Sequence, residues 1–440
     1  MIVGVSEGFH DAAICILNDN EIVFASHAER HSRKKGDKYL HEDQLSKIRD
    51  NRDAIVSYYE KPFSKNLRRL YAGQRWKKPR LKYDVSFNHH ESHAAAGYYT
   101  APFDDCNIIV VDAIGEWDTV SIWDNMKKVK SWKYPYSLGL LYSAITQRIG
   151  LKPNEDEYIT MGMAAFGQPI YDLEPLLWQN NHRGVGNVWK DAWKVDLAAS
   201  VQALYEKKLL ELVDMCPKEN IILMGGCALN CVANSKIQGK NIWIMPSPGD
   251  AGSALGAAAL VNKRKLQWEG PYLGTDIDRP VWVRGVIQEL LKNKVCGVAH
   301  GRAEFGPRAL GNRSLLGDPR YNIKDTVNDI KRRQRFRPFA PAILEEYADE
   351  YFEGPMNEYM QFVATAKHDY KSVTHVDGTA RVQVVKKNCK SVIRPILEEW
   401  YDATGCPMLL NTSLNIKGEP IVDSPRDAAR FMEKYNVQVF

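Results

Sequence analysis

The sequence predicts a soluble α/β protein, and three observations lead to that fold class. Short β-rich runs joined by polar turns open the chain, two strand–glycine–helix units follow in its middle, and a second α/β pattern fills residues 275–440. At 440 residues the chain is about three times as long as a typical domain of ~150 residues, so two or three domains are expected.

The elements expected in the first domain follow in chain order. Its strands are short, apolar and bounded by turn residues: 2–6, 12–17, 22–26, 108–112 and a pair within 115–123. Apolar residues recur with helical spacing over 137–149 and 200–215. The two strand–glycine–helix units cover 221–237 and 246–261. The stretch 262–282, which mixes charge with Gly and Pro, is expected to be a linker or domain edge.

Composition is typical of a globular protein of the cytoplasm. Hydrophobic residues make up 44% and charged residues 26% of the chain, which excludes a disordered or collagen-like protein. No apolar run approaches the ~18 residues of a membrane span, and the opening MIVGVSEGFHD lacks the basic region of a signal peptide. The eight cysteines include no CxxC pair, so reduced thiols are expected. Cys227 and Cys231, four residues apart, are the alternative metal pair.

The motif NHHESHAAAGYY carries the most specific local signal. His89 and His93 are four residues apart, so on a helix both imidazoles lie on one face and reach a single ion. Taken alone, the pair is equally well explained by two partly buried structural histidines. Two carboxylates change that balance, because Asp112 ends an apolar strand and Asp250 lies in a glycine-rich loop before a helix. Such a set suits a divalent cation such as iron, manganese or zinc.

Glycine-rich turns of the first domain predict a nucleotide site. The pair Gly225 and Gly226 ends a strand, where backbone without a Cβ can approach a nucleoside or a phosphate. One helical turn apart beyond it are two amides that are expected to bond the ribose or the base, Asn230 and Asn234. His10, in the turn between the first two strands, is a candidate general base or hydrogen-bond donor. Alternatively, the two glycines serve only close packing, and His10 is a solvent-exposed turn residue without a catalytic role.

The second half of the chain is predicted to contain an anion site. Its cations are interleaved with Gly, Pro and Phe rather than set along one helix face: Arg302, Arg308, Arg313, Arg320, Lys331, Arg333, Arg337 and Arg381. Guanidinium groups bind phosphate or carboxylate in a bidentate manner, and their spread over several loops favours a pocket over a nucleic-acid surface. Four side chains near a later strand can position a small planar group such as a carbamoyl: Asn411, Thr412, Ser413 and Asn415.

Nine blocks of sequence, taken in order, resemble one known family. They are HDAAICIL, HHESHAAAGYY, MGMAAFG, GGCALN, GDAGSALGAA, EFGPRALGNRS, FRPFAP, DGTARVQ and LNTSLN. Over essentially its whole length the chain is similar to the nodulation-type O-carbamoyltransferases, which carbamoylate nodulation factors, cephamycins, ansamycins and aminoglycosides. The resemblance implies a two-lobed actin/sugar-kinase-type (ASKHA) domain at 1–270, which holds ATP and a metal. It also implies a threonylcarbamoyl-adenylate-synthase-like (YrdC-like) domain at 276–440.

The same resemblance implies a reaction. Carbamoyl phosphate and ATP would form carbamoyl-adenylate in the second domain, and an acceptor hydroxyl would attack it at the metal of the first. The metal would be Fe(II), with Mg²⁺ accompanying the nucleotide, and its ligands would be His89, His93, Asp112 and Asp250. His10 and Asp11 would be catalytic. The adenosine site would be lined by Gly225, Gly226, Asn230 and Asn234. Carbamoyl phosphate would be bound by Arg308, Lys331, Arg337, Arg381, Asn411, Thr412, Ser413 and Asn415.

The chain departs from the family pattern at three residues and in one length. Ile159 stands where a lysine is usual before the MGMAAFG block, Gln334 replaces a glutamate, and Leu414 replaces a phenylalanine. The isoleucine removes one polar contact but not the reaction. The stretch between MGMAAFG and GGCALN is much shorter than is usual, so the acceptor cleft is expected to be more open and to suit a bulky acceptor.

The segment 61–82 is the basis for choosing an acceptor. It contains nine lysines and arginines, no acidic residue and interleaved aromatic residues, a composition typical of polyanion binding. The predicted nucleic-acid contacts are Arg68, Arg69, Arg75, Trp76, Lys77, Lys78 and Arg80. The leading hypothesis is therefore carbamoylation of a hydroxymethylated pyrimidine in DNA, reached by base flipping or in a single strand. A solvated basic surface is the alternative interpretation.

Three other functions are weighed against this hypothesis. A small sugar or natural-product hydroxyl keeps the chemistry and changes only the acceptor. Threonylcarbamoylation of tRNA uses both domain types, but it needs threonine and bicarbonate, and the fused order with the FRPFAP and LNTSLN blocks argues against it. A non-catalytic, ATP-dependent nucleic-acid-binding module is disfavoured by the retained metal ligands and arginines.

Overall fold

Residues 1–440 are all described by the computed structural model, in which the chain forms two units. Unit 1 comprises residues 1–23 and 44–268, and unit 2 comprises residues 24–43 and 269–440. The predicted boundary near 270 did not include the assignment of residues 24–43 to the C-terminal unit. Residues 24–43 carry no local sequence signal for that assignment, because a segment that joins a unit distant in sequence does so through contacts made only in the folded chain.

Unit 1 contains two five-stranded sheets that share one topology, although residues 24–27 of one edge strand are assigned to unit 2. The strand order is β3-β2-β1-β4-β5 in the first sheet and β8-β7-β6-β9-β10 in the second. In each sheet the first strand pairs antiparallel with the second and parallel with the fourth. The strands are β1 Ile2–Ser6, β2 Ala13–Asn18, β3 Glu21–His27, β4 Ile55–Tyr58, β5 Val85–Ser86, β6 Asn107–Val111, β7 Asp118–Asp124, β8 Lys127–Lys133, β9 Asn220–Met224 and β10 Asn241–Trp243. The repeated order agrees with the two-lobed α/β arrangement that the sequence predicts.

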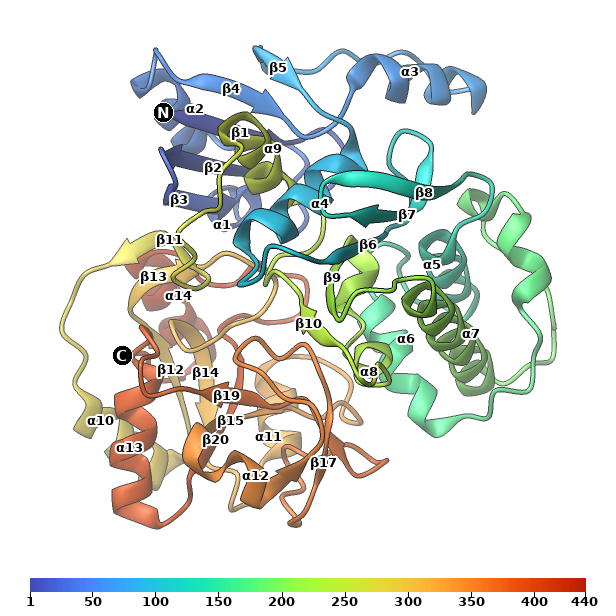
Figure 1. Cartoon of the computed structure of the whole chain (residues 1–440). Helices are drawn as coiled ribbons and strands as arrows, with labels where there is room; N and C mark the ends of the chain where they lie inside the picture. The colour runs from blue at the N-terminus through green and yellow to red at the C-terminus, as the bar shows by residue number, and fades with distance from the viewer. The chain divides into compact units, whose positions relative to one another are not determined.

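Two helices rich in small residues connect these sheets. Helix α9 (Ser253–Asn262) packs on β1, β2 and β4, helix α4 (His89–Thr100) packs on β6 and β9, and the two helices pack on each other (Figure 1). A Cβ on Gly256 would lie 1.8 Å from the backbone oxygen of Ser92, so only glycine permits this approach of α9 to α4. The N-terminal ends of both helices are thereby held close together.

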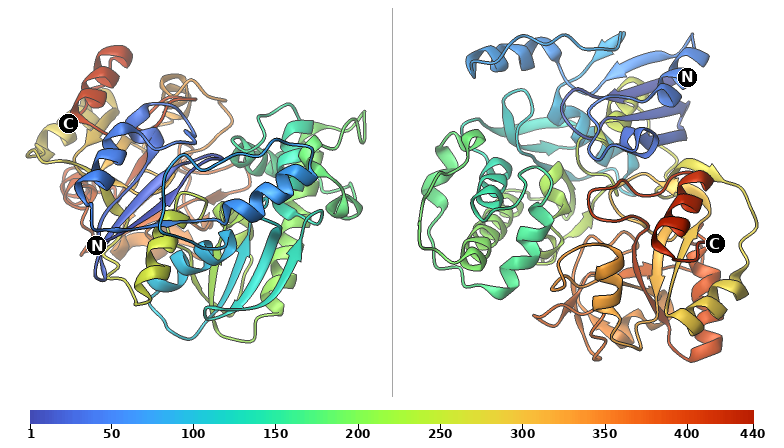
Figure 2. Two further views of the ribbon diagram at one scale, coloured as in Figure 1. Left: turned by 90° about the horizontal axis from the view of Figure 1, so that it is seen from above. Right: turned by 180° about the vertical axis from the view of Figure 1, so that it is seen from behind.

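The remaining helices of unit 1 include three that gather at the side of the second sheet, α5, α6 and α7 (Figures 1 and 2). The bounds are α2 Glu42–Asp50, α3 Pro62–Tyr71, α5 Leu138–Arg148, α6 Glu157–Met163, α7 Lys194–Asp214 and α8 Cys231–Asn234. Helices α5 and α7 confirm the predictions at 137–149 and 200–215. The strand pair predicted within 115–123 is wrong, because that stretch holds one strand, β7, whose partner β8 follows a turn at Asn125 with a φ of 50°.

Unit 2 is built on a five-stranded sheet of order β12-β14-β20-β15-β19. Its strands are β12 Val295–Ala299, β14 Arg313–Gly317, β15 Ala340–Leu344, β19 Gln383–Val385 and β20 Met408–Ser413. Helices α10 (Val283–Asn293) and α13 (Ile393–Thr404) pack on one face, where Trp400 is fully buried. The other face packs against α11 (Lys324–Ile330) and α14 (Pro425–Tyr435).

Smaller elements complete unit 2. They are α1 Ala28–Ser32, β11 Tyr272–Ile277, β13 Gly301–Glu304, α12 Ala348–Tyr351, β16 Phe352–Glu353, β17 Ala364–Ala366 and β18 Thr379–Ala380. Strand β11 pairs antiparallel with β13 and lies inside the stretch 262–282. The division between the two units at 268/269 falls inside this predicted linker or domain edge. A linker is wrong only for 272–277, where Gly and Pro residues flank a strand instead of replacing one.

The eight cysteines are all unpaired, as the sequence predicts for reduced thiols. Cys227 and Cys231 are not part of the cluster of potential metal ligands that the structure contains. None of the helices combines the length and the apolar composition that a membrane crossing requires.

Replacing Gly256 by alanine should lower the midpoint of thermal unfolding. The added Cβ would meet the Ser92 oxygen at 1.8 Å, so α4 and α9 must separate, and overpacking of this kind costs about 1–3 kcal/mol. Gly162→Ala is the matched control, because nothing lies within 4 Å of its Cβ and alanine favours a helix by up to ~1 kcal/mol over glycine. Calorimetry of both variants measures the effect, and an unchanged midpoint for Gly256→Ala would contradict the close helix contact.

Candidate functional site

Helix α4 presents two imidazoles on one face at its N-terminal end. Asn88 and Glu91 form a capping box that starts the helix. His89 and His93 follow at positions i and i+4, and their side chains are 3% and 0% exposed. Ala94–Ala96 add little bulk behind them, so the helix lies close to its neighbours and the histidines are buried.

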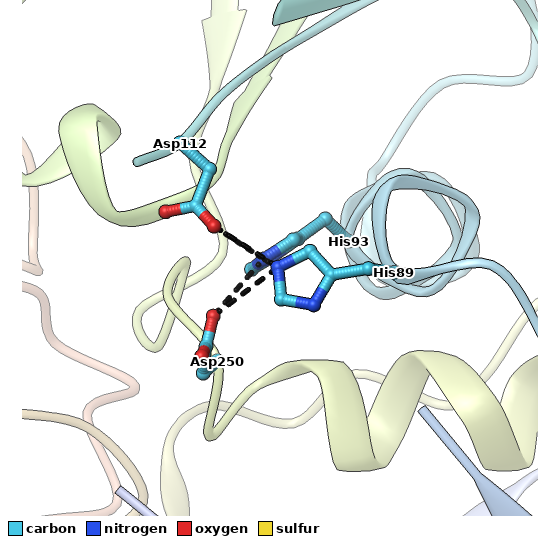
Figure 3. A group of neighbouring side chains, drawn as sticks. All are labelled: His89, His93, Asp112 and Asp250. Atoms are coloured by element: carbon cyan, nitrogen blue, oxygen red, sulfur yellow. Dashed lines mark hydrogen bonds and ion pairs between the residues drawn. The ribbon is translucent and has the colours of Figure 1, made fainter. Parts of the chain in front are cut away.

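Two carboxylates from other elements complete the cluster. Asp112 follows β6, and its Oδ2 lies 2.9 Å from Nε2 of His89. Asp250 lies in the loop before α9, and its Oδ1 is 3.4 Å from Nε2 of both histidines. The ligand atoms of all four residues lie within 4.8 Å of one another, and Figure 3 shows them pointing at a common centre. The structure therefore brings together the four residues that the sequence predicts as metal ligands.

The chemistry of this donor set fits a divalent cation. The two Nε2 atoms are 3.0 Å apart, where a single proton at most can lie between them. Burial lowers the pKa of His89, but the charges of Asp250 and Asp112 outweigh it and hold that pKa well above its ordinary value. Burial also opposes the ionised form of Asp250, yet the neighbouring imidazoles hold its pKa well below the usual range. Two ionised carboxylates and two imidazoles are ligands preferred by first-row divalent metals.

The turn between β1 and β2 places His10 and Asp11 beside the cluster. Nδ1 of His10 lies 3.0 Å from the Asp11 carboxylate, and Nε2 lies 3.9 Å from the Asp250 carboxylate. Burial lowers the pKa of His10, but the hydrogen bond with Asp11 and the charge of Asp250 raise it to about 9. A bound cation would offset the charge of Asp250 and so lower the pKa of His10 towards the range of a general base. The imidazole is one-third exposed, so a substrate can reach it.

The predicted nucleotide turn borders the same cluster. Gly225 has a φ of 89°, and a Cβ there would lie 2.2 Å from the backbone oxygen of Val111, so only glycine fits between β9 and β6. The N–H of Gly226 donates to Oδ1 of Asp112 over 3.3 Å. The predicted adenosine-binding glycines therefore lie directly beside one of the predicted metal ligands.

The two asparagines of that turn hold the fold together. Oδ1 of Asn230 accepts from the N–H of Ala233 over 3.0 Å and caps α8, while its amide donates to Gln202 over 2.9 Å. Asn234 is buried, and its amide donates to the carbonyl of Ala228 over 2.9 Å. Both were predicted to bond the ribose or the base, but these amide groups are already used to shape the turn. The sequence indicates residue type and spacing, and it does not indicate the direction of a side chain in so short a helix.

Glu116 is a site residue that sequence reasoning missed. Its buried carboxylate accepts from the N–H of His89 over 3.1 Å and from the N–H of Lys61 over 2.7 Å. One carboxylate therefore bonds the first N–H of α4 and that of the residue before α3, where the helix dipoles favour negative charge. Glu116 lies in the turn before β7 and belongs to no motif, so no sequence signal could have identified it.

A cavity of about 490 Å³ opens beside the metal cluster, a volume within the range of small-molecule sites. His89 and Asp250 line it together with aromatic rings, polar groups and cations. These further residues include Phe9, Tyr59, Glu60, Lys65, Arg68, Arg69, Tyr71, Tyr134, Ser143, Gln147, Asn180, Asn181, His182 and Arg183. Asn180–Arg183 carries no sequence signal for this role, because it meets α3 only in the folded chain.

The seven predicted nucleic-acid contacts have different environments. Arg68 and Arg69 line the cavity. Trp76 packs edge-on against another ring of its own segment, and Nζ of Lys77 donates to the carbonyl of Gly8 over 3.3 Å. The side chains of Arg75, Lys78 and Arg80 are exposed. The basic segment therefore contributes to the cavity as well as to the outer surface.

In unit 2 the structure brings Lys331 together with the residues at the end of β20. Nζ of buried Lys331 donates to Oδ1 of Asn415 over 2.7 Å and to the hydroxyl of Ser413 over 3.0 Å. Burial, together with the charges of Arg333 and Arg337, holds the pKa of Lys331 well below its ordinary value. An anion bound beside this ammonium group would stabilise its charged form.

The other predicted carbamoyl-phosphate residues lie along β20 and in the neighbouring loops. Asn411 is buried, and its amide donates to Oε1 of Gln383 over 2.7 Å, while its Oδ1 has no hydrogen-bond partner. Thr412 pairs with β14 in the sheet. Arg308 donates to the carbonyl of Met360, and Nε of Arg381 is buried without a partner. The backbone N–H of Arg337 donates to the carbonyl of Gln334 over 3.3 Å.

Two arginines of the predicted anion site support the fold instead. Arg313 is fully buried, and its guanidinium donates to backbone carbonyls that include those of His300, Thr275 and Asp423. Arg320 forms an ion pair of 2.9 Å with Asp318. The predicted anion role is wrong for Arg313 because five carbonyl groups occupy its donors, a fact that composition cannot reveal.

Comparison with known proteins gives matches over most of the chain. The family model described as carbamoyltransferase N-terminus matches residues 48–179 and 179–259, and that described as carbamoyltransferase C-terminus matches 287–440. Nodulation protein NolO of Bradyrhizobium diazoefficiens is 32% identical over 78% of this chain and 75% of its own length. An uncharacterized protein of Synechocystis is 32% identical over 98% of this chain and 93% of its own.

Two details of these matches concern the stretch between the MGMAAFG and GGCALN blocks, which is predicted to be shorter than is usual in the family. The N-terminal family match breaks at residue 179, and the alignment with the Synechocystis protein spans 575 positions, more than this chain has residues.

Among solved structures, the activator of a 2-hydroxyisocaproyl-CoA dehydratase from Clostridium difficile has a TM-score of 0.40 and 15% identity, and it covers 60% of this chain and 94% of its own. Likeness at that level assigns no ligand to this chain.

Replacing His89 or His93 by alanine should abolish metal binding, because each variant removes one of four converging ligands. His90→Ala is the matched control on the same helix, since Nδ1 of His90 points instead to the hydroxyl of Ser121 at 2.8 Å. Metal content after reconstitution with Fe²⁺, Mn²⁺ or Zn²⁺ is measured by plasma mass spectrometry. Close to one ion per chain is expected for His90→Ala. The same metal content in His89→Ala would contradict the assignment of His89 as a metal ligand.

Proposed function

Because the chain belongs to the carbamoyltransferase family, and is thus a transferase, we propose that it moves a carbamoyl group from carbamoyl phosphate to an acceptor hydroxyl. ATP is the proposed co-substrate and carbamoyl-adenylate the proposed intermediate. The observation that carries this proposal is the convergence of two imidazoles and two carboxylates beside His10 and a cavity of about 490 Å³. Such a site suits attack by a hydroxyl on an activated carbonyl.

Unit 2 is the proposed place of activation. Carbamoyl phosphate loses phosphate to water, and the resulting carbamate oxygen attacks the α-phosphorus of ATP, which releases pyrophosphate. Lys331, held by Ser413 and Asn415, supplies positive charge for this step. Oδ1 of Asn411, buried without a hydrogen-bond partner, offers an acceptor for the carbamoyl N–H.

Unit 1 is the proposed place of transfer. Nδ1 of His10 is engaged by Asp11, which leaves Nε2 to take the proton of the acceptor hydroxyl. The hydroxyl oxygen bonds to the carbamoyl carbon, the bond from that carbon to the adenylate oxygen breaks, and AMP leaves. A divalent metal held by the four-residue cluster, Fe(II) by the family resemblance, supplies Lewis acidity when bound. The Gly225–Gly226 turn lets the nucleotide, with its Mg²⁺, approach the backbone.

A cavity of about 490 Å³ has room for a group of nucleoside or monosaccharide size. This favours a sugar or natural-product hydroxyl. A hydroxymethylated pyrimidine in DNA is the second candidate, and Arg68 and Arg69 in the cavity support it if the base is flipped out or the strand is single.

Labelled carbamoyl phosphate distinguishes the two acceptors. The metal-loaded chain is incubated with ATP and [¹⁴C]carbamoyl phosphate, with either hydroxymethylated single-stranded DNA or a panel of sugars. Label should enter one acceptor class in an ATP-dependent manner. Transfer to DNA should fall steeply with salt, because cation–phosphate contacts release counterions, whereas transfer to a neutral sugar should change little. Absence of ATP-dependent label in both classes would count against carbamoyl transfer to these hydroxyl groups.

Two substitutions should separate the half-reactions. His10→Asn removes the base, so transfer should fall by about 10²-fold or more while carbamate-dependent ATP–pyrophosphate exchange persists. Lys331→Met removes the buried cation and should abolish exchange while the metal content stays that of the wild-type chain. Loss of exchange in His10→Asn would show that this residue acts in activation, contrary to the role proposed here.

A further inference from the structure

The cavity beside the metal cluster has one strongly cationic wall. Helix α3 and the 3₁₀ turn η3 (Asn181–Arg183) bring together four cations from distant parts of the sequence: Lys65, Arg68, Arg69 and Arg183. The same cavity is bordered by His89 and Asp250 of the metal cluster. A ligand that fills it would therefore contact both the cations and the reaction centre.

Only one of these four cations has a carboxylate partner. Nζ of Lys65 donates to both oxygens of Glu60 over 2.7 Å. The guanidinium groups of Arg68, Arg69 and Arg183 form no ion pair with any carboxylate of the chain. The wall therefore presents three cations whose charge is not balanced by direct contact.

Arg68 is the arginine of this wall that lies deepest in the protein. Its side chain is half-buried and its Nε has no hydrogen-bond partner. Burial lowers the pKa of Arg68, although the charges of Glu60 and Glu116 act to raise it. Burial and the neighbouring Tyr71 raise the pKa of Tyr134, while the charges of Arg183 and Arg68 act to lower it, so the two guanidinium groups lie near one phenol. Cations that line one cavity wall attract an anion into the cavity.

We infer that the acceptor of the proposed reaction carries a phosphate ester, which Arg68, Arg69 and Arg183 bind while the acceptor hydroxyl lies at the metal cluster. This inference rests on the proposed function. One guanidinium suffices to bind a carboxylate in a bidentate manner, whereas three guanidinium groups can together contact the several oxygens of a phosphate. The rings of Phe9, Tyr59 and Tyr134 line the cavity and provide stacking surfaces for a sugar or base.

One end of the cationic wall lies close to the point where the family match divides into two segments. The family match breaks at residue 179, and the next four residues, Asn180–Arg183, line the cavity. Loops carried by a common scaffold are the usual place for changes in specificity. Arg183, in a short turn of the cavity wall, is therefore placed to take part in selecting the acceptor.

Matched pairs of probes test the phosphate. Calorimetry with the metal-loaded full chain compares 5-hydroxymethyl-2′-deoxycytidine with its 5′-monophosphate, and N-acetylglucosamine with its 1-phosphate. In at least one pair the phosphorylated member should bind about tenfold tighter or more, since charge-assisted contacts to phosphate are strong. Arg68→Gln/Arg69→Gln and Arg183→Gln should each lose most of that preference. Lys82→Gln, an exposed cation of the same segment outside the cavity, should keep it.

Arg183→Gln keeps the test valid if the double variant fails to fold, because Arg183 lies exposed in a short turn. Equal affinities within both pairs, or a preference that survives all three arginine substitutions, would overturn the inference. So would loss of ATP–pyrophosphate exchange in the arginine variants, because the arginines would then serve the nucleotide. If the phosphate preference is present and depends on the arginines but no carbamoyl is transferred, the proposed function fails and the phosphate site stands.

Two sources of the phosphate are separated by one further probe. A single-stranded oligonucleotide with one 5-hydroxymethylcytosine is compared with the monophosphate at two salt concentrations. Tighter, salt-sensitive binding of the strand, weakened by Lys78→Gln outside the cavity, identifies a nucleotide within a polymer. Tighter binding of the monophosphate identifies a free phosphorylated compound.

Discussion

The close packing of α4 on α9 is the contact on which the candidate active site depends. Gly256 and the alanines of both helices allow the two backbones to approach until a Cβ would no longer fit. That approach carries the start of α4, with its two imidazoles, to the loop before α9, with its carboxylate. Two bulky helices at ordinary spacing would hold these groups too far apart to share one ion.

Much of this site could be predicted from the sequence, for reasons that differ between residues. His89 and His93 were predictable because helical spacing alone places them on one face, and Asp112 because a strand ends there. The role of Asn230 and Asn234 in binding adenosine stays a prediction, because their amide N–H groups donate within the turn and a residue's position does not fix where its amide points. Glu116 and Asn180–Arg183 were missed because each acts across a distance in sequence that no local pattern spans.

Unit 2 shows the same limit for charge. In the sequence Lys331 and Arg313 are equivalent candidates, since both are cations placed among Gly, Pro and Phe residues. In the structure Lys331 contacts two side chains, which can give way to a ligand, and one backbone carbonyl, that of Ser413. The donors of Arg313 are instead taken up by backbone carbonyls alone. The difference between a binding cation and a structural one therefore lies in the partner atoms, and these depend on the fold.

The shared contact of Glu116 has a mechanical consequence. Its carboxylate bonds the N–H groups at the starts of both α3 and α4, so neither helix can shift without leaving a buried charge partly unsatisfied. Glu116 therefore connects helix α3, which lines the cavity, to helix α4, which carries the imidazoles. The distance between the cationic wall and the metal cluster is therefore fixed before a ligand enters the cavity. The site is preorganised in this sense.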